Sequence, residues 1–358
     1  MRPKINILNL KQIDEISKKY NTPYDEAVLM QLNLTTSINS CTPNTLAKVF
    51  LDKNKTTSVL YFKEIEGVCS ADEDYIYLYG EKALKKLPFE KKDFQKTKFG
   101  NARGNVVSLD SNYTSNCSSC LFCERDNTLN YCYDSNNIHH ISAEMNKFQE
   151  NLTIDFAKLK EIVIVTSCFP NEKKTVDHMI NVSKVAQNMG FKGTLGILSS
   201  SITSKEGLRR IGDNIEKPKI LFTLECLDNR EKIVSKNKLK LNSNDIKQIM
   251  ENENSNGILS SFCHIIGLDS IQKVVENAET LLPYTNFFPN FHVIRRHNEK
   301  IDPFLQSDAL SLEFMLKSRQ SLENVYKSTK LRPDIQRTIN SLWYNNFDNT
   351  PLSSYFEL

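Results

Sequence analysis

The segment Val106-Val107-Ser108-Leu109 and the loop after it, which contains Asn116-Cys117-Ser118-Ser119-Cys120-Leu121-Phe122-Cys123, decide the fold of this chain. The first segment is short, apolar and rich in valine, which predicts a strand. The loop brings three thiols, Cys117, Cys120 and Cys123, within seven positions. Clustered thiolates suit an iron–sulfur cluster with one open iron, and suit a closed structural zinc site less well. The rest of the sequence must decide between the iron–sulfur cluster and the zinc site.

The bulk composition is that of an ordinary globular protein of 358 residues, enough for one large domain or two smaller ones. A net charge of +3, from 46 Lys+Arg and 43 Asp+Glu, does not favour nucleic acid or an acidic membrane surface as a partner. No apolar run approaches the roughly 20 residues of a membrane span, and no secretion signal is recognisable, so we expect a cytoplasmic protein. Nine cysteines are then expected to be reduced, and clustered ones to bind metal or act in catalysis.

Residues 1–104 are predicted to form a separate α+β extension, which serves as a cap or a substrate-binding region or has only a packing role. Leu10–Lys19 and Pro23–Leu32 have helical apolar spacing. Ser58–Phe62 and Tyr75–Tyr79 are rich in β-branched and aromatic residues, as strands are.

Two further segments of this region are predicted to be helical. Thr42-Pro43 is expected to open a short helix that runs through Val49 and Phe50. Glu81–Lys98 is strongly charged, which predicts a solvated helix followed by a linker.

Residues 105–300 alternate short apolar strands with amphipathic helices, and residues 301–358 are predicted to be a helical extension. Six β-then-α units indicate a parallel sheet covered by helices, either an open doubly wound sheet or a full or partial barrel. In both folds ligands bind beyond the C-terminal ends of the strands, so the residues there are the candidate site. The predicted strands are Val106–Leu109, Glu161–Thr166, Gly193–Leu198, Lys219–Leu224, Ile258–Ile266 and Asn290–Ile294.

The cysteine loop after the first of six such strands resembles the radical S-adenosylmethionine (radical SAM) superfamily. Asn112-Tyr113 before the loop and Phe122 before its last cysteine are similar to the biotin synthase and lipoyl synthase members. The resemblance implies an α/β fold, a partial (β/α)6 TIM-like barrel with an N-terminal α+β extension and C-terminal helices. The chain departs from the usual spacing: two residues separate Cys117 from Cys120, where the superfamily usually has three.

The resemblance also implies cofactors and a reaction. Cys117, Cys120 and Cys123 would hold a 4Fe-4S cluster, whose free iron is chelated by the amino and carboxylate groups of S-adenosylmethionine. One-electron reduction, by a flavodoxin- or ferredoxin-like low-potential donor, then cleaves S-adenosylmethionine to methionine and a 5′-deoxyadenosyl radical. This radical abstracts hydrogen from a small-molecule or peptide substrate.

Several strand ends are similar to the S-adenosylmethionine contacts of the superfamily. Phe122 is implied to pack near the adenine. Thr166 and Ser167 stand where many members have a Gly-Gly-Glu-like turn that binds the methionine amino group; here only backbone carbonyls and Ser167 could serve. Glu225 or Asp228 would accept hydrogen bonds from the ribose, although Asp228 could equally cap a helix.

The last two strand ends carry further resemblances. Gly267 lies in a segment similar to the one beside the adenine, where glycine permits a close backbone approach. Ile294 would contact the adenine through its backbone. Arg209, Arg210 and Arg230 are candidates for binding the methionine carboxylate, because a guanidinium binds a carboxylate with two hydrogen bonds.

Other cysteines leave two questions open. Cys168, Cys226 and Cys263 fall at or within predicted strands and are either ligands of a second cluster or buried inert thiols. Cys132 could replace Cys117 as a cluster ligand, or be the fourth ligand of a structural zinc. The zinc alternative describes an α/β binding module that recognises RNA or a partner protein.

Overall fold

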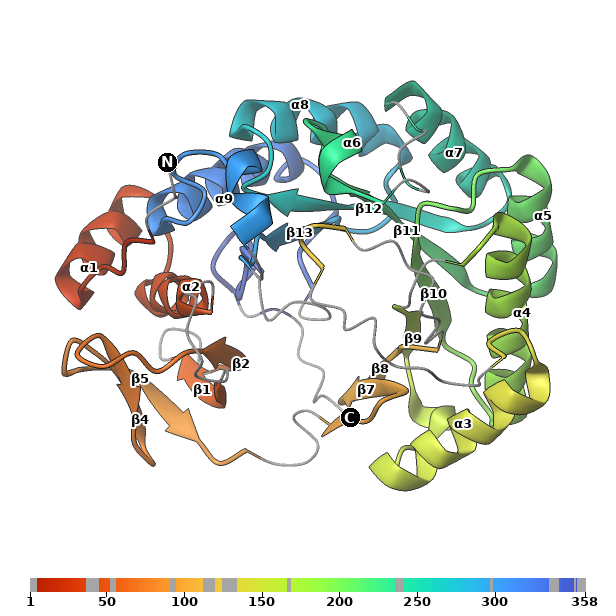
Figure 1. Ribbon diagram of the computed structural model, residues 1–358, viewed down its shortest axis with the longest axis horizontal. Helices are drawn as coiled ribbons and strands as arrows, with labels where there is room; N and C mark the ends of the chain where they lie inside the picture. Colours follow the sequence, from red (N-terminus) through yellow and green to blue (C-terminus); the bar gives the residue numbers. More distant parts are fainter. Residues whose placement is uncertain are drawn as a thin grey trace.

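The protein is a mixed α/β structure with two sheets, one antiparallel with five strands and one with eight strands (Figure 1). The predicted α/β class is therefore confirmed. The computed structural model describes residues 5–36, 45–51, 56–89, 95–111, 120–123, 134–165, 169–235, 238, 241, 243–296, 299–334, 341–350 and 352.

The five-stranded sheet belongs to the N-terminal part of the chain and has the order β2-β1-β5-β4-β3, with every pair antiparallel. Two helices accompany it, α1 (Leu10–Lys19), as predicted, and α2 (Tyr24–Thr35). The strands are β1 (Thr45–Leu51), β2 (Thr56–Phe62), β3 (Cys69–Ala71), β4 (Tyr75–Leu78) and β5 (Glu81–Leu87).

Two predictions for this region were wrong, because two segments expected to be helical are the strands β1 and β5. In β1 the side chains of Ala47, Val49 and Leu51 are buried while their neighbours are partly exposed, which is the alternation of a strand. In β5 only Leu84 is buried, and its charged residues lie outside the core. Pairing with its hairpin partner β4 and with the sequence-distant β1 makes β5 the middle strand, so pairing within the sheet overrides its helical composition.

Helix α2 is the buried centre of the N-terminal part. Every side chain from Glu26 to Thr35 is buried, because the helix packs against β2 and β5 on one side and against α9 (Leu312–Tyr326) on another. One continuous core joins these elements to the strands β11, β12 and β13. The N-terminal part is therefore packed against the end of the large sheet.

The eight-stranded sheet has its strands in sequence order, from β6 to β13. The six strands β8 to β13 are parallel to their neighbours, which confirms the predicted parallel sheet, and β6 and β7 add antiparallel strands at the β8 edge. β6 and β7 precede residue 105, and the division into domains stays a prediction. The strands are β6 (Gln95–Lys96), β7 (Gly100–Arg103), β8 (Val106–Leu109), β9 (Glu161–Ile164), β10 (Thr194–Ser199), β11 (Pro218–Glu225), β12 (Leu259–Ile266) and β13 (Asn290–Val293).

Helices cover the outer, convex face of this sheet (Figure 1). Val107, Leu109, Ile162 and Ile164 belong to the core between these strands and helices. No helix among the described residues is both long enough and apolar enough to span a bilayer. The helices of this part are α3 (Ile138–Leu152), α4 (Glu172–Asn188), α5 (Lys205–Asn214), α6 (Arg230–Ile233), α7 (Ser243–Ser255) and α8 (Ile271–Leu281), with the 3-10 turns η2 (Phe156–Lys158), η4 (Leu282–Tyr284) and η5 (Glu299–Phe304).

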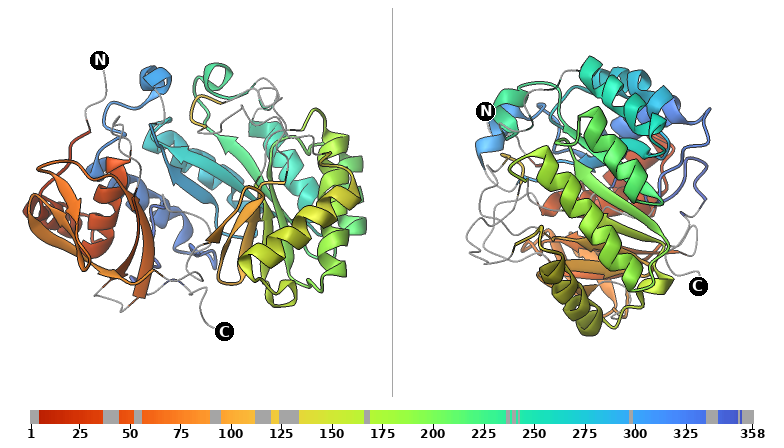
Figure 2. Two further views of the ribbon diagram at one scale, coloured as in Figure 1. Left: turned by 60° about the horizontal axis from the view of Figure 1, so that its bottom comes forward. Right: turned by 90° about the vertical axis from the view of Figure 1, so that its right-hand side faces the viewer.

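The sheet is curled, and its alternate residues face the inside of the curl. Ser108 of β8 and Val163 of β9 are register partners that line a cavity of about 390 Å³ there. Asn290 and His292 of β13 line the same cavity, although β13 and β6 are the opposite edges of the sheet. Since both edges contribute to one space, the curl brings the two ends of the sheet toward each other (Figures 1 and 2). We call this space the concave cavity.

Candidate functional site

The described part of the cysteine loop, residues 120–123, is docked at the C-terminal end of β11. The amide of Cys123 donates to the carbonyl of Cys120 at 3.0 Å, which closes a turn. The amide of Leu121 donates to the Ile233 carbonyl at 2.9 Å, and the amide of Ser235 donates to the Cys120 sulfur at 3.3 Å. Cys117, Cys132, Cys168, Thr166 and Ser167 lie outside the described residues.

Some surroundings of Cys120 disfavour its thiolate form, while others stabilise it. Burial raises the pKa of the Cys120 thiol, while the charge of Lys238 and the Ser235 amide lower it. A buried thiolate needs such cations or hydrogen-bond donors, or a bound metal ion, to be stable. An N–H···S bond of this kind is one of the contacts that tune iron–sulfur clusters. Cys123 is half-buried on the same turn, so the two described thiols suit a metal cluster.

Glu225 ends β11 beside this turn in an unusual backbone conformation. Its φ of 71° is in the left-handed region, and the register of β11 against β12 shifts between Thr223 and Glu225. For a residue with a side chain this conformation costs on the order of 1–2 kcal/mol. The bulge directs the carboxylate to Lys238, whose Nζ lies 2.9 Å from Oε1. A carboxylate and an ammonium group thus stand close to Cys120, and both influence its pKa.

Arg230 fixes this region from α6. Its guanidinium is buried and donates to the carbonyl of Leu224, to that of Cys226 at 3.1 Å and to that of Lys238 at 2.9 Å. These bonds join the end of β11 to the Lys238 segment, so Arg230 positions the backbone around Cys120.

The other two arginines suggested by the sequence lie on α5, in the outer layer of helices. Arg209 pairs with Glu206 at 2.9 Å and with Asp213 at 2.6 Å, and Arg210 pairs with Asp177 at 2.6 Å. The structure does not bring these two residues to the described turn of the cysteine loop, residues 120–123.

Asp269 holds the turn that follows β11, a role that the sequence did not reveal. Its carboxylate accepts hydrogen bonds from the amides of Leu227 and Asp228 at 2.8 and 2.7 Å and from His264 Nε2 at 3.0 Å. Burial works to raise the pKa of Asp269, but His264 and the two amides keep it below its usual value. Asp228 forms an ion pair with Lys273 and is partly exposed.

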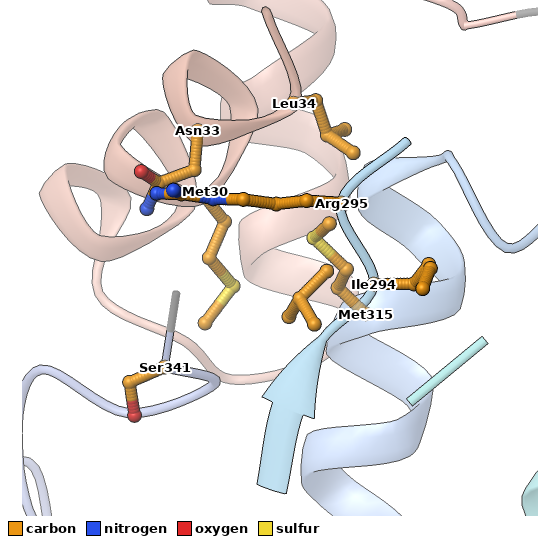
Figure 3. Close-up of a pocket in the computed structure, with 8 residues that line it drawn as sticks. Met30, Asn33, Leu34, Ile294, Arg295, Met315 and Ser341 are labelled. Atoms are coloured by element: carbon orange, nitrogen blue, oxygen red, sulfur yellow. The ribbon is translucent and has the colours of Figure 1, made fainter. Parts of the chain in front are cut away.

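Gly267 and Ile294 are in contact with each other. Gly267 has a φ of +112°, and a Cβ added there would lie 2.7 Å from Cγ2 of Ile294 and 3.1 Å from Cβ of Ala309. Glycine is required here by this packing. Figure 3 shows Arg295, the next residue, extending toward Asn33 on α2.

The small pocket at this junction, which Ile294 also lines, has a volume of about 10 Å³. That volume is about enough for one water molecule, so the pocket cannot hold an adenine ring.

His178 of α4 ties together two segments that flank the cysteine loop. Its Nδ1 donates to the carbonyl of Ser135, so the unprotonated Nε2 accepts from the hydroxyl of Ser111 at 2.7 Å. Ser111 follows β8, and Ser135 precedes α3. Asn181, one turn further along α4, donates to the Asn136 carbonyl at 2.9 Å. The chain on both sides of residues 112–133 is therefore anchored to one helix.

We expect His178 to make the protein less stable in acid. Burial lowers the pKa of His178 from 6.5 to about 4, so between these values the unfolded chain binds a proton that the folded protein does not. The free energy of unfolding then falls by about 1.4 kcal/mol per pH unit as the pH drops from 6.5 toward 4. Urea unfolding at pH 7 and pH 5 measures this loss in wild type and in His178→Asn, whose amide keeps a donor for Ser135.

The loss between the two pH values should be roughly 2 kcal/mol larger in wild type than in His178→Asn. All other titratable groups are shared, so the difference isolates His178. Exposed His139 provides the control, and His139→Asn should behave like wild type. An unchanged pH dependence in His178→Asn would show that the residue does not titrate as described.

The remaining cysteines of the large sheet do not form a ligand group in the described part of the chain. Cys226 and Cys263 are buried, and burial raises the pKa of Cys226 to about 12. Within the described ranges, no three His, Cys, Asp or Glu side chains lie close enough together to hold a metal ion. Cys117 is outside those ranges, so this finding does not cover the three-cysteine set.

No protein family model matches the chain, and a search of curated proteins found no significant match.

Proposed function

We propose that the chain is a radical SAM enzyme that acts on a small-molecule or peptide substrate. The observation that carries the proposal is the position of the Cys120–Cys123 turn, at the C-terminal end of a parallel strand and with an N–H···S bond to Cys120. Ligands of parallel α/β folds bind at this edge. The run of six β/α units, whose first strand leads into the cysteine loop, favours this function over a zinc-loop binding module, which would not need those units.

We further propose that the curled sheet is a partial (β/α)6 barrel. The sequence order and parallel pairing of β8 to β13 support this, as does the concave cavity that both edges of the sheet line. A partial barrel leaves one side open, where the N-terminal part packs against β13 and α9.

The residues of the chain have distinct roles in this proposal. Cys120 and Cys123 would hold a 4Fe-4S cluster together with Cys117, which lies outside the described residues. A bound cluster would supply the electron that cleaves S-adenosylmethionine, after its own reduction by a flavodoxin- or ferredoxin-like donor. The Ser235 amide and Lys238 favour the thiolate form of Cys120.

The surrounding polar groups position this edge of the sheet and contribute hydrogen-bonding groups. Arg230 and Asp269 hold the backbone after β11 in place. Phe122 packs on the core next to Cys123, and Glu225 and Asp228 are the carboxylates of this edge. These are the groups that we propose to contact S-adenosylmethionine, with Thr166, Ser167, Gly267 and Ile294 as the other candidates.

Anaerobic reconstitution of the full chain with ferrous iron and sulfide tests the proposal. We expect a brown protein with about four irons per chain and a paramagnetic reduced state whose spectrum changes when S-adenosylmethionine is added. Dithionite and S-adenosylmethionine should then give 5′-deoxyadenosine, measured by mass spectrometry. A colourless protein that binds one zinc and forms no 5′-deoxyadenosine would contradict the proposal.

A further inference from the structure

The concave cavity has the size of a small-molecule site. Its volume of about 390 Å³ lies within the range of roughly 300–1,000 Å³ that is usual for such sites. Strands from both edges of the curled sheet line it, and the exposed Lys96, Lys98 and Val165 lie at its open side.

Positive charge dominates the lining. Lys96, Lys98 and Arg103 contribute three cationic side chains, and Asp110 contributes one carboxylate, which gives a net formal charge of +2. All three cations come from the β6–β7 hairpin or its turn, while the chain as a whole has only +3. The β6–β7 hairpin therefore carries a much higher density of positive charge than the protein as a whole. Such concentration inside a concave surface attracts anions.

The strands beside the hairpin give the cavity an apolar wall. Val106 of β8, Val163 of β9, Val165 just after β9 and Leu198 of β10 line it. A ligand that complements both walls has an apolar body and an anionic group.

Hydrogen-bonding side chains also line the cavity. Asn101 belongs to the hairpin, Ser108 is its register partner on β8, and Asn290 and His292 reach the cavity from β13. These groups can orient the polar part of a ligand. The lining excludes a large hydrocarbon and favours a compact molecule with a phosphate or carboxylate.

The cavity extends to the edge of the sheet from which the cysteine loop departs. Asp110 directly follows β8, one residue before the His178-bound Ser111, and Val165 directly follows β9. We propose that the concave cavity binds a small organic anion, held by the cationic β6–β7 hairpin, and that this anion is the substrate class of the enzyme. The assignment as substrate rests on the proposed function, whereas the binding itself does not.

Isothermal titration calorimetry of the full chain, without iron and without S-adenosylmethionine, tests the binding. The probe is phenyl phosphate, a compact dianion with an apolar ring, and benzyl alcohol is its neutral counterpart. We expect saturable binding of phenyl phosphate, weakened by added salt, and no measurable binding of benzyl alcohol. Equal binding of both probes, or of neither at millimolar concentration, would overturn the proposal.

Variants locate the site. Lys96 and Lys98 are exposed, so the double change Lys96→Gln with Lys98→Gln should leave the thermal unfolding midpoint unchanged. It should raise the Kd for phenyl phosphate at least about tenfold, because each lost cation removes a charge-assisted hydrogen bond. Lys147 on α3 and Lys173 on α4, exposed lysines outside the cavity, are the matched control, and their double change to glutamine should leave the Kd unchanged. An equal loss in both double variants would place the phosphate elsewhere.

A different result would contradict each of the two proposals. Binding of the anion without any 5′-deoxyadenosine formation would contradict the radical SAM function and keep the cavity assignment. Formation of 5′-deoxyadenosine without anion binding would do the reverse.

Discussion

Cys120→Ala is expected to abolish assembly of the iron–sulfur cluster and to lower 5′-deoxyadenosine formation at least about 100-fold. The two remaining thiols of a three-cysteine set cannot complete the coordination that the proposed cluster needs. The fold should survive, since the substitution removes one sulfur and the bond that it accepts from Ser235, a loss of about 1 kcal/mol. Iron content, the spectrum of the reduced protein and product formation measure the first effect, and thermal unfolding measures the second.

Cys69→Ala is the matched control for this experiment. Cys69 is a buried thiol of β3, in the N-terminal sheet, and burial raises its pKa to about 12. Its variant should keep both iron and turnover. If Cys120→Ala kept them as well, Cys120 would not be a ligand. If Cys120→Ala instead lost a bound zinc and unfolded, the loop would be a structural metal site, whose metal contributes folding free energy directly.

The parallel sheet could be predicted from sequence because its strands are nearly continuous apolar runs. β8 was predicted with its observed bounds, and β9 to β13 were predicted within two residues at each end. Buried strands of this kind carry their signal locally, in the run itself. The N-terminal sheet carries a weaker signal, since β5 has the composition Glu81-Lys82-Ala83-Leu84-Lys85-Lys86-Leu87 and only one buried side chain. Pairing with β4 in a hairpin and with β1, which lies far away in sequence, makes it a strand.

The edge of the sheet where the site lies could be predicted, but the contacts within it could not. Because ligands of parallel sheets bind beyond the C-terminal ends of the strands, Glu225 and the loop of Cys120 were candidate site residues. The structure brings them close together. Lys238, the ion-pair partner of Glu225, lies in a segment without any motif. His178 likewise looks like an ordinary helical histidine in the sequence. It bonds Ser111, 67 positions away, and Ser135, 43 positions away. Such pairings depend on how the chain folds back on itself and have no local signature.

Arg319→Met is expected to destabilise the protein by about 3–5 kcal/mol. Arg319 of α9 is only 3% exposed, and its Nη1 lies 2.7 Å from Oε2 of Glu26 on α2, which is fully buried. Removing the guanidinium leaves the Glu26 carboxylate buried without its cation. A total stability of 5–15 kcal/mol is usual for a folded domain, so the loss is large. Urea unfolding at pH 7 measures it.

Two further variants separate the ion pair from simple packing. Arg209→Met on α5 removes an exposed guanidinium from ion pairs with Glu206 and Asp213, and should cost less than about 1 kcal/mol. Adding Glu26→Gln to Arg319→Met should restore part of the lost stability, because an amide can be buried at lower cost than an unpaired carboxylate. Glu323, the other partner of Arg319, is 22% exposed and can be hydrated once the guanidinium is gone. Equal losses in Arg319→Met and Arg209→Met would mean that α2 is held against α9 by apolar contacts alone. A recovery in the double variant would instead identify the Glu26–Arg319 pair as a link between α2 and α9.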